Sequence, residues 1–139
     1  MTWAPTKTQE AFFNALNGDT TLQTLLGGAG KIFDSVPDNT AFPYVVLNIK
    51  PWTDRGNHVS EGLTADPIIH VFYQSPNRGD LKVQNIQARI DALIHKIDIS
   101  ITGWTIISLR RTTLDILIDP DNVTLHGIQI YKLLIGEVI

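Results

Sequence analysis

Cysteine is absent from the 139 residues of this chain. Its absence excludes disulfide bridges, thiolate metal sites and cysteine nucleophiles. The chain also lacks a basic excess, since 11 lysines and arginines stand against 14 aspartates and glutamates and give a net charge of −3. Proteins that grip nucleic acid through its phosphates usually carry such an excess, so this kind of binding is not predicted.

Long apolar runs are missing as well. The sequence holds no run of about 18 uncharged apolar residues, so we expect no membrane-spanning helix. Its first residues, MTWAPTKTQE, do not have the basic segment and apolar run of a secretory signal. What is present is 43% apolar and 18% charged residues, a composition typical of a globular protein and not of a disordered one. The length predicts one domain over residues 1–139.

The start of the chain predicts a first helix. Thr6 or Thr8 is expected to cap it, with the carboxylate of Glu10 in the first turn, where it suits the positive end of the helix dipole. Asn17 and Gly18 tolerate positive φ and are expected to end this helix.

A second short helix and a first strand follow. Asp19 is expected to cap a helix from Thr20 to Leu26, which a glycine-rich segment ends. Residues 31–33 are predicted to be a short extended piece. Residues 42–49 are rich in β-branched and aromatic side chains and predict a strand.

The middle of the chain predicts a long loop between two strands. Residues 51–67 are polar, carry a proline at each end, and are interpreted as a long connection of the kind that is often functional. A strand is predicted over residues 68–74. From residue 78 to about residue 96, apolar side chains recur at helical spacing and predict one long amphipathic helix.

The last third predicts a β-hairpin. Residues 104–118 and 123–137 are two long β-rich runs, and the turn-forming sequence Asp-Pro-Asp-Asn separates them at residues 119–122. The predicted fold is therefore α+β. It has a four-stranded, mostly antiparallel sheet packed by one long helix, with short N-terminal helices.

The last strand is apolar on both faces. Leu125, Tyr131, Leu133 and Ile135 point one way, whereas Ile128, Ile130 and Leu134 point the other way. A four-stranded antiparallel sheet usually has one polar face, so such a strand needs a cover on each side. The N-terminal helices are one candidate for the second cover, and a neighbouring subunit is the other.

Residues with catalytic potential do not form a recognisable motif. The four histidines, His58, His70, His95 and His126, show no metal-binding spacing, and no paired carboxylates or nucleophile motif accompanies them. We therefore predict no enzyme, no metal and no cofactor. The alternative enzyme would be a hydrolase in which His70 or His126 converges with an aspartate in one cleft.

An interaction or assembly protein is the better interpretation. Arg110 and Arg111 are adjacent, so in a strand they point to opposite faces and are candidates for ion pairs across a subunit boundary. Tryptophan in a polar setting is typical of interfaces. The candidate interface residues are Trp52, Asp54, Arg55, His58, Glu61, Arg110, Arg111, Ile130 and Leu133.

Four stretches, in this order along the chain, resemble one protein family. They are LNGDTTLQTLLGG at residues 16–28, KIFDSVPDNTAFPYVVL at 31–47, IIHVFYQS at 68–75 with the helix after it, and DPDNVTLHGIQIY at 119–131. Together they resemble the tail-completion or tail-terminator proteins of long-tailed bacteriophages and gene-transfer agents. Residues 51–67 match no motif of that family.

This resemblance implies a structural virion protein. It implies a homo-oligomeric ring, usually hexameric, that caps the tail tube, stops its polymerisation and joins the tail to the head connector. The implied partners are the tail tube protein and the connector or stopper protein, with DNA passing through the lumen without specific binding. The implied location is the head-proximal end of the tail, reached by assembly in the host cytoplasm. No membrane, metal or cofactor is implied.

Two other classes of function remain open at this point. One is a different head–tail joining protein, such as a stopper or adaptor, which would meet the connector side and not the tube end. The other is a non-viral small binding module, which predicts a deep pocket and a stable monomer.

Overall fold

The computed structural model describes residues 3–57, 60–74, 79–95 and 99–138. In chain order its elements are α1 (Ala4–Asn17), α2 (Thr20–Leu26), β1 (Ile32–Phe33), β2 (Tyr44–Asp54), β3 (Gly62–Gln74), α3 (Leu81–His95), β4 (Trp104–Ile118) and β5 (Thr124–Glu137). The predicted α+β class is confirmed, and α2 and β4 have the predicted bounds.

The sheet has five strands in the order β1-β2-β3-β5-β4. The prediction of four strands was wrong because the short extended piece at residues 31–33 joins the sheet as β1. Ile32 and Phe33 pair in parallel with Val45 and Val46 of β2, whereas every other neighbouring pair is antiparallel. A two-residue strand has too little pattern to be assigned to a sheet from sequence.

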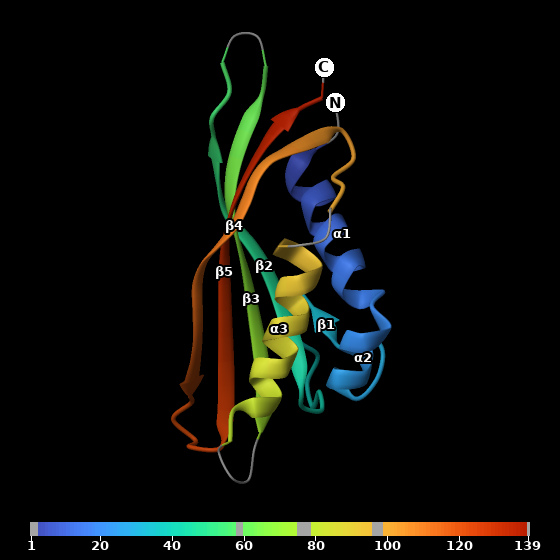
Figure 1. The fold of residues 1–139 in the computed structure, drawn as a ribbon, viewed down its shortest axis with the longest axis vertical. Coiled ribbons are helices and arrows are strands. Elements are labelled where there is room, and N and C mark those ends of the chain that lie inside the picture. The colour runs from blue at the N-terminus through green and yellow to red at the C-terminus, as the bar shows by residue number, and fades with distance from the viewer. Residues whose placement is uncertain (1–2, 58–59, 75–78, 96–98, 139) are drawn as a thin grey trace.

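All three helices lie on one side of the sheet (Figure 1). Helices α1 and α2 pack against α3, and α1 also contacts β2. The sequence left open whether the N-terminal helices cover the second face of the sheet. They do not, because they share a single layer with α3. One sheet face is therefore covered by helices, and the opposite face is called the open face below.

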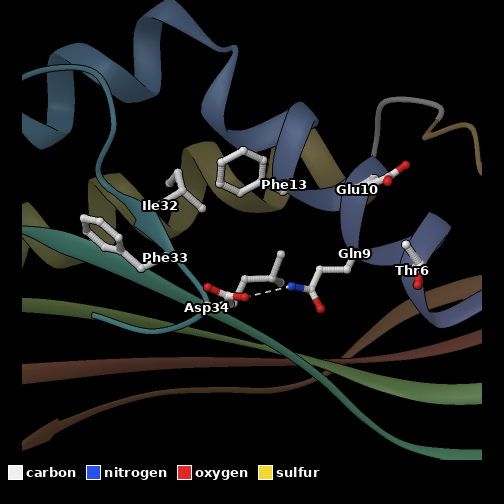
Figure 2. A pocket seen from close by; sticks show the side chains of 8 residues that line it. Thr6, Gln9, Glu10, Phe13, Ile32, Phe33 and Asp34 are labelled. Carbon is white, nitrogen blue, oxygen red and sulfur yellow. Dashed lines mark hydrogen bonds between the residues drawn. The ribbon is translucent and has the colours of Figure 1, made fainter. Parts of the chain in front are cut away.

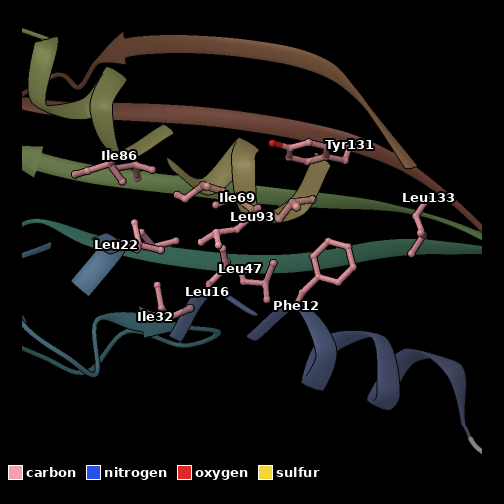
Figure 3. Close-up of a cluster of buried hydrophobic side chains, with 14 of the residues drawn as sticks. Phe12, Leu16, Leu22, Ile32, Leu47, Ile69, Ile86, Leu93, Tyr131 and Leu133 are labelled. Carbon is pink, nitrogen blue, oxygen red and sulfur yellow. The ribbon is translucent and has the colours of Figure 1, made fainter. Parts of the chain in front are cut away.

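The hydrophobic core lies between the helix layer and the sheet (Figure 3). Along β5 the buried side chains alternate with half-buried ones, which confirms the predicted division of this strand between two faces. Phe12 and Leu16 of α1, Ile90 of α3 and Leu133 of β5 all belong to this core. The buried residues that alternate along the strands and the apolar residues on one side of each helix thus face the same core.

The first helix begins earlier than predicted. It starts at Ala4, with Trp3 as N-cap and no side-chain capping bond, so neither Thr6 nor Thr8 caps it. A proline in the first turn marks the start of this helix instead of a capping side chain. The fixed φ of proline suits that position, and backbone N–H groups in the first turn have no partner within the helix, so the lack of one costs nothing. The predicted end at Asn17 is confirmed, but Gly18 follows it with a φ of −88° and not with the expected positive φ.

The second helix is capped as predicted. The side chain of Asp19 accepts a hydrogen bond from the backbone N–H of Leu22 at 2.8 Å, and Gly27 ends the helix with a φ of 81°. Arg89 of α3 donates two further bonds to the Asp19 carboxylate, at 2.8 and 2.7 Å. These bonds from Arg89 hold the pKa of Asp19 below its usual value. The capping carboxylate therefore also joins α2 to α3.

The predicted long loop at residues 51–67 is mostly sheet. Strand β2 continues to Asp54 and β3 begins at Gly62, so only residues 55–61 connect them. The prolines misled the prediction. Pro51 lies in a register shift between Ile49 and Trp52, where a missing N–H costs no ladder bond. The hairpin projects past the helices (Figure 1), which lets its strands carry polar side chains.

The turn between β4 and β5 is confirmed. Asp121 Oδ1 accepts hydrogen bonds from the backbone N–H groups of Val123 and Thr124, at 2.9 and 2.8 Å. Asn122 takes a φ of 64°, a conformation that asparagine tolerates well. The hydrogen bonds that Asp121 accepts lower the pKa of its carboxyl group, and the one from the Thr124 side chain lowers it most.

Candidate functional site: the open face and the two edges of the sheet

The open face is apolar along its centre. Half-buried side chains from three adjacent strands form it, although no helix packs over them: Tyr44 and Val46 of β2, Ile68, His70 and Phe72 of β3, and His126, Ile128, Ile130 and Leu134 of β5. Surfaces of this kind mark sites of protein association. The open face is therefore the first candidate for a contact with another molecule.

Stacked rings cross the lower part of the open face. Tyr44 and Phe72 stack with ring centroids 5.3 Å apart, and Phe72 stacks on His126 at 4.3 Å. Phe42 extends the row with a centroid 5.2 Å from Tyr44. Such offset pairs of planar rings add stability beyond the area they bury. The row gives this face an aromatic region.

Two histidines meet at the end of that row. Nδ1 of His70 and Nε2 of His126 lie 2.6 Å apart, and Nδ1 of His126 lies 4.0 Å from a carboxylate oxygen of Asp119. Burial lowers the pKa of both histidines, and the positive charge of protonated His126 would lower that of His70 further. Both rings are thus uncharged near neutral pH, with one nitrogen of the pair donating and the other accepting.

This pair is not a catalytic arrangement. Asp119 approaches His126 only at the 4.0 Å limit of an ion pair, and both rings belong to the open face of the sheet. The described part of the chain holds no group of three or more metal-ligating side chains. The described helices also include none that is long and apolar enough to cross a membrane.

Charged residues occupy the upper part of the open face. Lys132 of β5 pairs with Asp66 of β3 at 3.1 Å. Arg110 of β4 lies directly opposite Lys132 in the ladder, so two cations are cross-strand neighbours. Like charges in that position repel each other. Arg110 has no ion pair among the described residues, which leaves its charge available to a partner.

Beneath α3, on the helix-covered face, several polar side chains are bonded to one another, although Oε1 of Gln129 is buried without a hydrogen-bond partner among the described residues. The hydroxyl of Tyr131 donates to Asp91 at 2.8 Å and accepts from Gln129 at 3.1 Å. Gln129 also donates to the backbone carbonyl of Gln87 at 3.0 Å, and Arg111 pairs with Asp91 at 2.9 Å. Burial and the bond to Asp91 raise the pKa of Tyr131 far above its usual value. This network fixes α3 on β5 and has no reactive member.

Strand β4 forms one edge of the sheet. It is 15 residues long, and no strand in the described part of the chain pairs with its outer side. Four of its apolar side chains are exposed, namely Ile107, Leu114, Leu117 and Ile118. Natural proteins usually shorten or cover such an edge because it invites pairing with another chain. A long apolar edge is therefore a second candidate contact surface.

The opposite edge carries a groove between α1 and β1 (Figure 2). Its volume is about 580 Å³, and it is lined by Thr6, Gln9, Glu10, Phe13, Ile32, Phe33, Asp34 and Leu47. Gln9 donates to Asp34 at 3.2 Å across it. We call this the α1–β1 groove. Its floor is apolar, and two carboxylates stand at its rim.

The predicted interface residues of the central segment gather near the hairpin tip. Trp52 is half-buried and packs against the core, so it anchors the hairpin. Asp54, Arg55 and Glu61 are exposed, and the tip is closed by a 2.6 Å bond from the backbone N–H of Arg55 to the carbonyl of Gly62. His58 lies outside the described residues.

The remaining predicted residues are divided between the two faces. Arg110 and Ile130 belong to the open face, and Arg111 lies on the helix-covered side, as the adjacent positions predicted. Leu133 is 0% exposed and belongs to the core, so its side chain has no surface to offer a partner. The structure thus does not bring the predicted residues into one patch.

Sequence reasoning missed the ring row and the groove. A signal for the row was present in residues 68–74, IIHVFYQ. Ile68, His70 and Phe72 alternate there with the apolar residues of the covered face, so this strand has few polar positions on either face, as the last strand does. The groove had no such signal, since it joins α1 to a strand of two residues.

Comparison with known protein families decides the relationship. Residues 10–136 match the family described as tail completion protein gp17. The chain belongs to the tail completion protein gp17 family. It is therefore related to structural virion proteins of bacteriophage tails and not to enzymes. A comparison with curated protein sequences gave no match.

Solved structures share the fold of this tail completion protein. A chain in the virion of a native gene transfer agent particle has a TM-score of 0.84 at 16% identity, covering 98% of this chain and 99% of that one. The gp17 protein of bacteriophage SPP1 has a TM-score of 0.58 at 19% identity, covering 99% of this chain and 94% of that one. At such identities the likeness shows the fold alone.

Proposed function

We propose that this protein is a tail terminator. Several copies, six by the resemblance of the sequence, form a ring on the finished tail tube, stop its polymerisation and join the tail to the head connector. The ring forms in the host cytoplasm and takes its place at the head-proximal end of the tail. Membership of the tail completion family supports the role in the tail.

The observation that carries this assembly role is the apolar open face, which we assign to the contact with the tail tube. It lies on the central strands of the sheet, and the helices of the described residues are on the other side. The unpaired edge of β4 and the α1–β1 groove, at opposite edges of the sheet, give each copy two further surfaces for contact between neighbouring copies. A closed ring requires two different and complementary surfaces on each subunit.

The hairpin of β2 and β3 supplies a contact along the axis. It projects beyond the helices, and Asp54, Arg55 and Glu61 stand exposed near its tip. We assign this tip to the tube or the connector. DNA passes through the lumen without a specific site, because the net charge of −3 gives no general attraction for phosphates.

Electron microscopy of the purified protein mixed with its tail tube protein tests this function. We expect rings on the ends of tubes of limited length, and long open tubes without the protein. The charged variant Ile130→Glu, on the open face, should lose capping. The matched variant Thr24→Glu, at an exposed position of α2, adds the same charge on the helix side, away from the open face, and should retain capping.

Two outcomes contradict the proposal. If the tubes kept growing while this protein stayed monomeric and unbound, the protein would not be a terminator. Rings that bind the connector but never a tube end would instead identify a stopper or adaptor of the connector.

A further inference from the structure

We propose that the exposed edge of β4 in one copy docks into the α1–β1 groove of a second copy. Leu114 meets the apolar floor of the groove, and Arg111 faces its carboxylates. This inference rests on the proposed function, because it names the two surfaces through which neighbouring subunits of the ring meet.

The groove has the chemistry to accept such an edge. Phe13 and Phe33 are half-buried at its floor beside Leu47, while Glu10 and Asp34 stand exposed at its rim. Glu10 pairs with Lys7 of its own helix at 3.3 Å. Asp34 is thus the carboxylate without a cation, since it accepts a bond from Gln9 but pairs with no cation among the described residues. The groove therefore suits an apolar side chain accompanied by a positive charge.

The edge of β4 carries that combination. Leu114 is 53% exposed and lies on the helix-covered side of the sheet, opposite Gln129 in the ladder. Arg111 lies on the same side and is bonded to Asp91 through Nη1. A guanidinium has five N–H donors, so this pair leaves donors for a second carboxylate. Leu114 and Arg111 thus match the floor and the rim of the groove.

The ladder places the two surfaces at the same height. Leu114 is the partner of Gln129, Gln129 of Ile69, and Ile69 of Leu47. Leu114 and Leu47 are therefore the two ends of one row across the sheet, and Leu47 lines the groove. A neighbour related by rotation about an axis along the strands brings Leu114 to the groove without sliding.

Strand direction is also compatible with this contact. Three antiparallel steps separate β2 from β4, so β4 runs antiparallel to β2 and to the parallel strand β1. Rotation about an axis along the strands preserves these directions. The edge of one copy would then run antiparallel to the strands beside the groove of the next, which is the commoner arrangement in sheets.

A symmetric contact between two β4 edges is disfavoured by charge. Antiparallel pairing of that strand with its own copy, centred near Arg110 and Arg111, places arginines of both copies side by side. Contact with the groove instead pairs them with carboxylates. The head-to-tail arrangement also uses two different surfaces, as a closed ring does.

Disulfide trapping tests the contact, because the natural chain has no cysteine. The variant with Gln9→Cys and Leu114→Cys should form a ladder of covalent oligomers under mild oxidation with tube protein present. The matched control carries Thr24→Cys, an exposed position on α2, with Leu114→Cys, and should stay monomeric on a non-reducing gel.

The possible results separate this contact from the proposed function. Rings on tube ends with no more cross-linking than in the control would overturn the contact and leave the terminator role standing. A wild-type protein that forms no rings would overturn both. A covalent dimer from Leu114→Cys alone would reveal a symmetric contact, and so contradict this one.

A pair of point variants tests the side of the strand that docks. Leu114→Asp should weaken self-association at least about tenfold, as expected for loss of a central apolar contact. Leu117→Asp, on the same strand but on the open face and 46% exposed, should change it less than about twofold. Sedimentation measures both, and equal effects of the two variants would contradict the assignment.

Discussion

Leu133 and Leu134 are neighbours on β5 and have the same side chain, yet they lie in different surroundings. Leu133 is fully buried under the helices, while Leu134 is half-buried on the open face. The contrast extends along the strand, since Leu125 and Tyr131 share the first side and Ile128 and Ile130 the second. Apolar residues on one strand therefore serve two purposes, the stability of the subunit and the adhesion of its surface.

The largest effect on stability is expected from shortening the two leucines themselves. Leu133→Ala should lower the free energy of unfolding by about 2–5 kcal/mol, because it leaves a cavity in the core. Leu134→Ala, the matched variant on the other face, should cost less than about 1 kcal/mol, since water already reaches that side chain. Urea denaturation of the two variants measures both, and equal losses would mean that the open face is covered within the subunit.

The second expected effect concerns the polar groups of the covered face. Tyr131→Phe should lower the free energy of unfolding by about 1–3 kcal/mol, because Asp91 loses one of its donors and Gln129 loses an acceptor. Tyr44→Phe serves as the control on the open face, where the ring row does not depend on the hydroxyl. If both variants were equally stable, the network beneath α3 would contribute nothing to stability.

A smaller effect depends on pH and belongs to the open face. Burial lowers the pKa of His70 and His126 below the ordinary value of 6.5. As the pH falls below 6.5, these histidines take up protons in the unfolded chain before they do so in the folded one. Their contribution to the free energy of unfolding is therefore fully present above that pH and is lost as the pH falls through their folded-state pKa values.

Denaturation at about pH 7.5 and about pH 5.5 measures this loss. The double variant with His70→Gln and His126→Gln should show a flatter dependence on pH than the wild type. An unchanged slope would mean that other groups cause the loss.

The smallest effect on stability is expected at the hairpin tip. Replacing residues 55–61 by a two-residue Asn-Gly turn should change the free energy of unfolding by less than about 0.5 kcal/mol, because the tip lies outside the core. Tube capping should nevertheless weaken, since the tip is assigned to the axial contact. Capping at the wild-type level would remove that assignment.

Local signals predicted much of the fold. Asp19 before a leucine-rich turn and Gly27 after it determine α2, because each satisfies backbone groups within a few residues. The alternating apolar pattern of β5 likewise predicted its two faces. Such features depend on neighbours in sequence, so they can be read before the structure is known.

Features that depend on distant partners were not predicted. Whether α1 covers one face or the other depends on its packing against α3, and no residue of α1 encodes that choice alone. Pro51 looked like the start of a loop because a bulge that accommodates it has no sequence pattern. The α1–β1 groove was missed for the same reason, since Phe13 and Phe33 meet only in the folded chain.

The side chain of Gln87 has a mechanical consequence. It extends from α3 across Gly127, where a Cβ would lie 2.7 Å from its amide nitrogen, and donates to the backbone carbonyl of Asp115 on β4 at 3.1 Å. A pull along β4 would load the whole ladder to β5 in shear, while an outward pull would peel it bond by bond. Because Gln87 bonds the C-terminal part of β4 to the helix layer, peeling from that end meets an additional bond after a few residues, and tension on that edge passes into the body of the subunit.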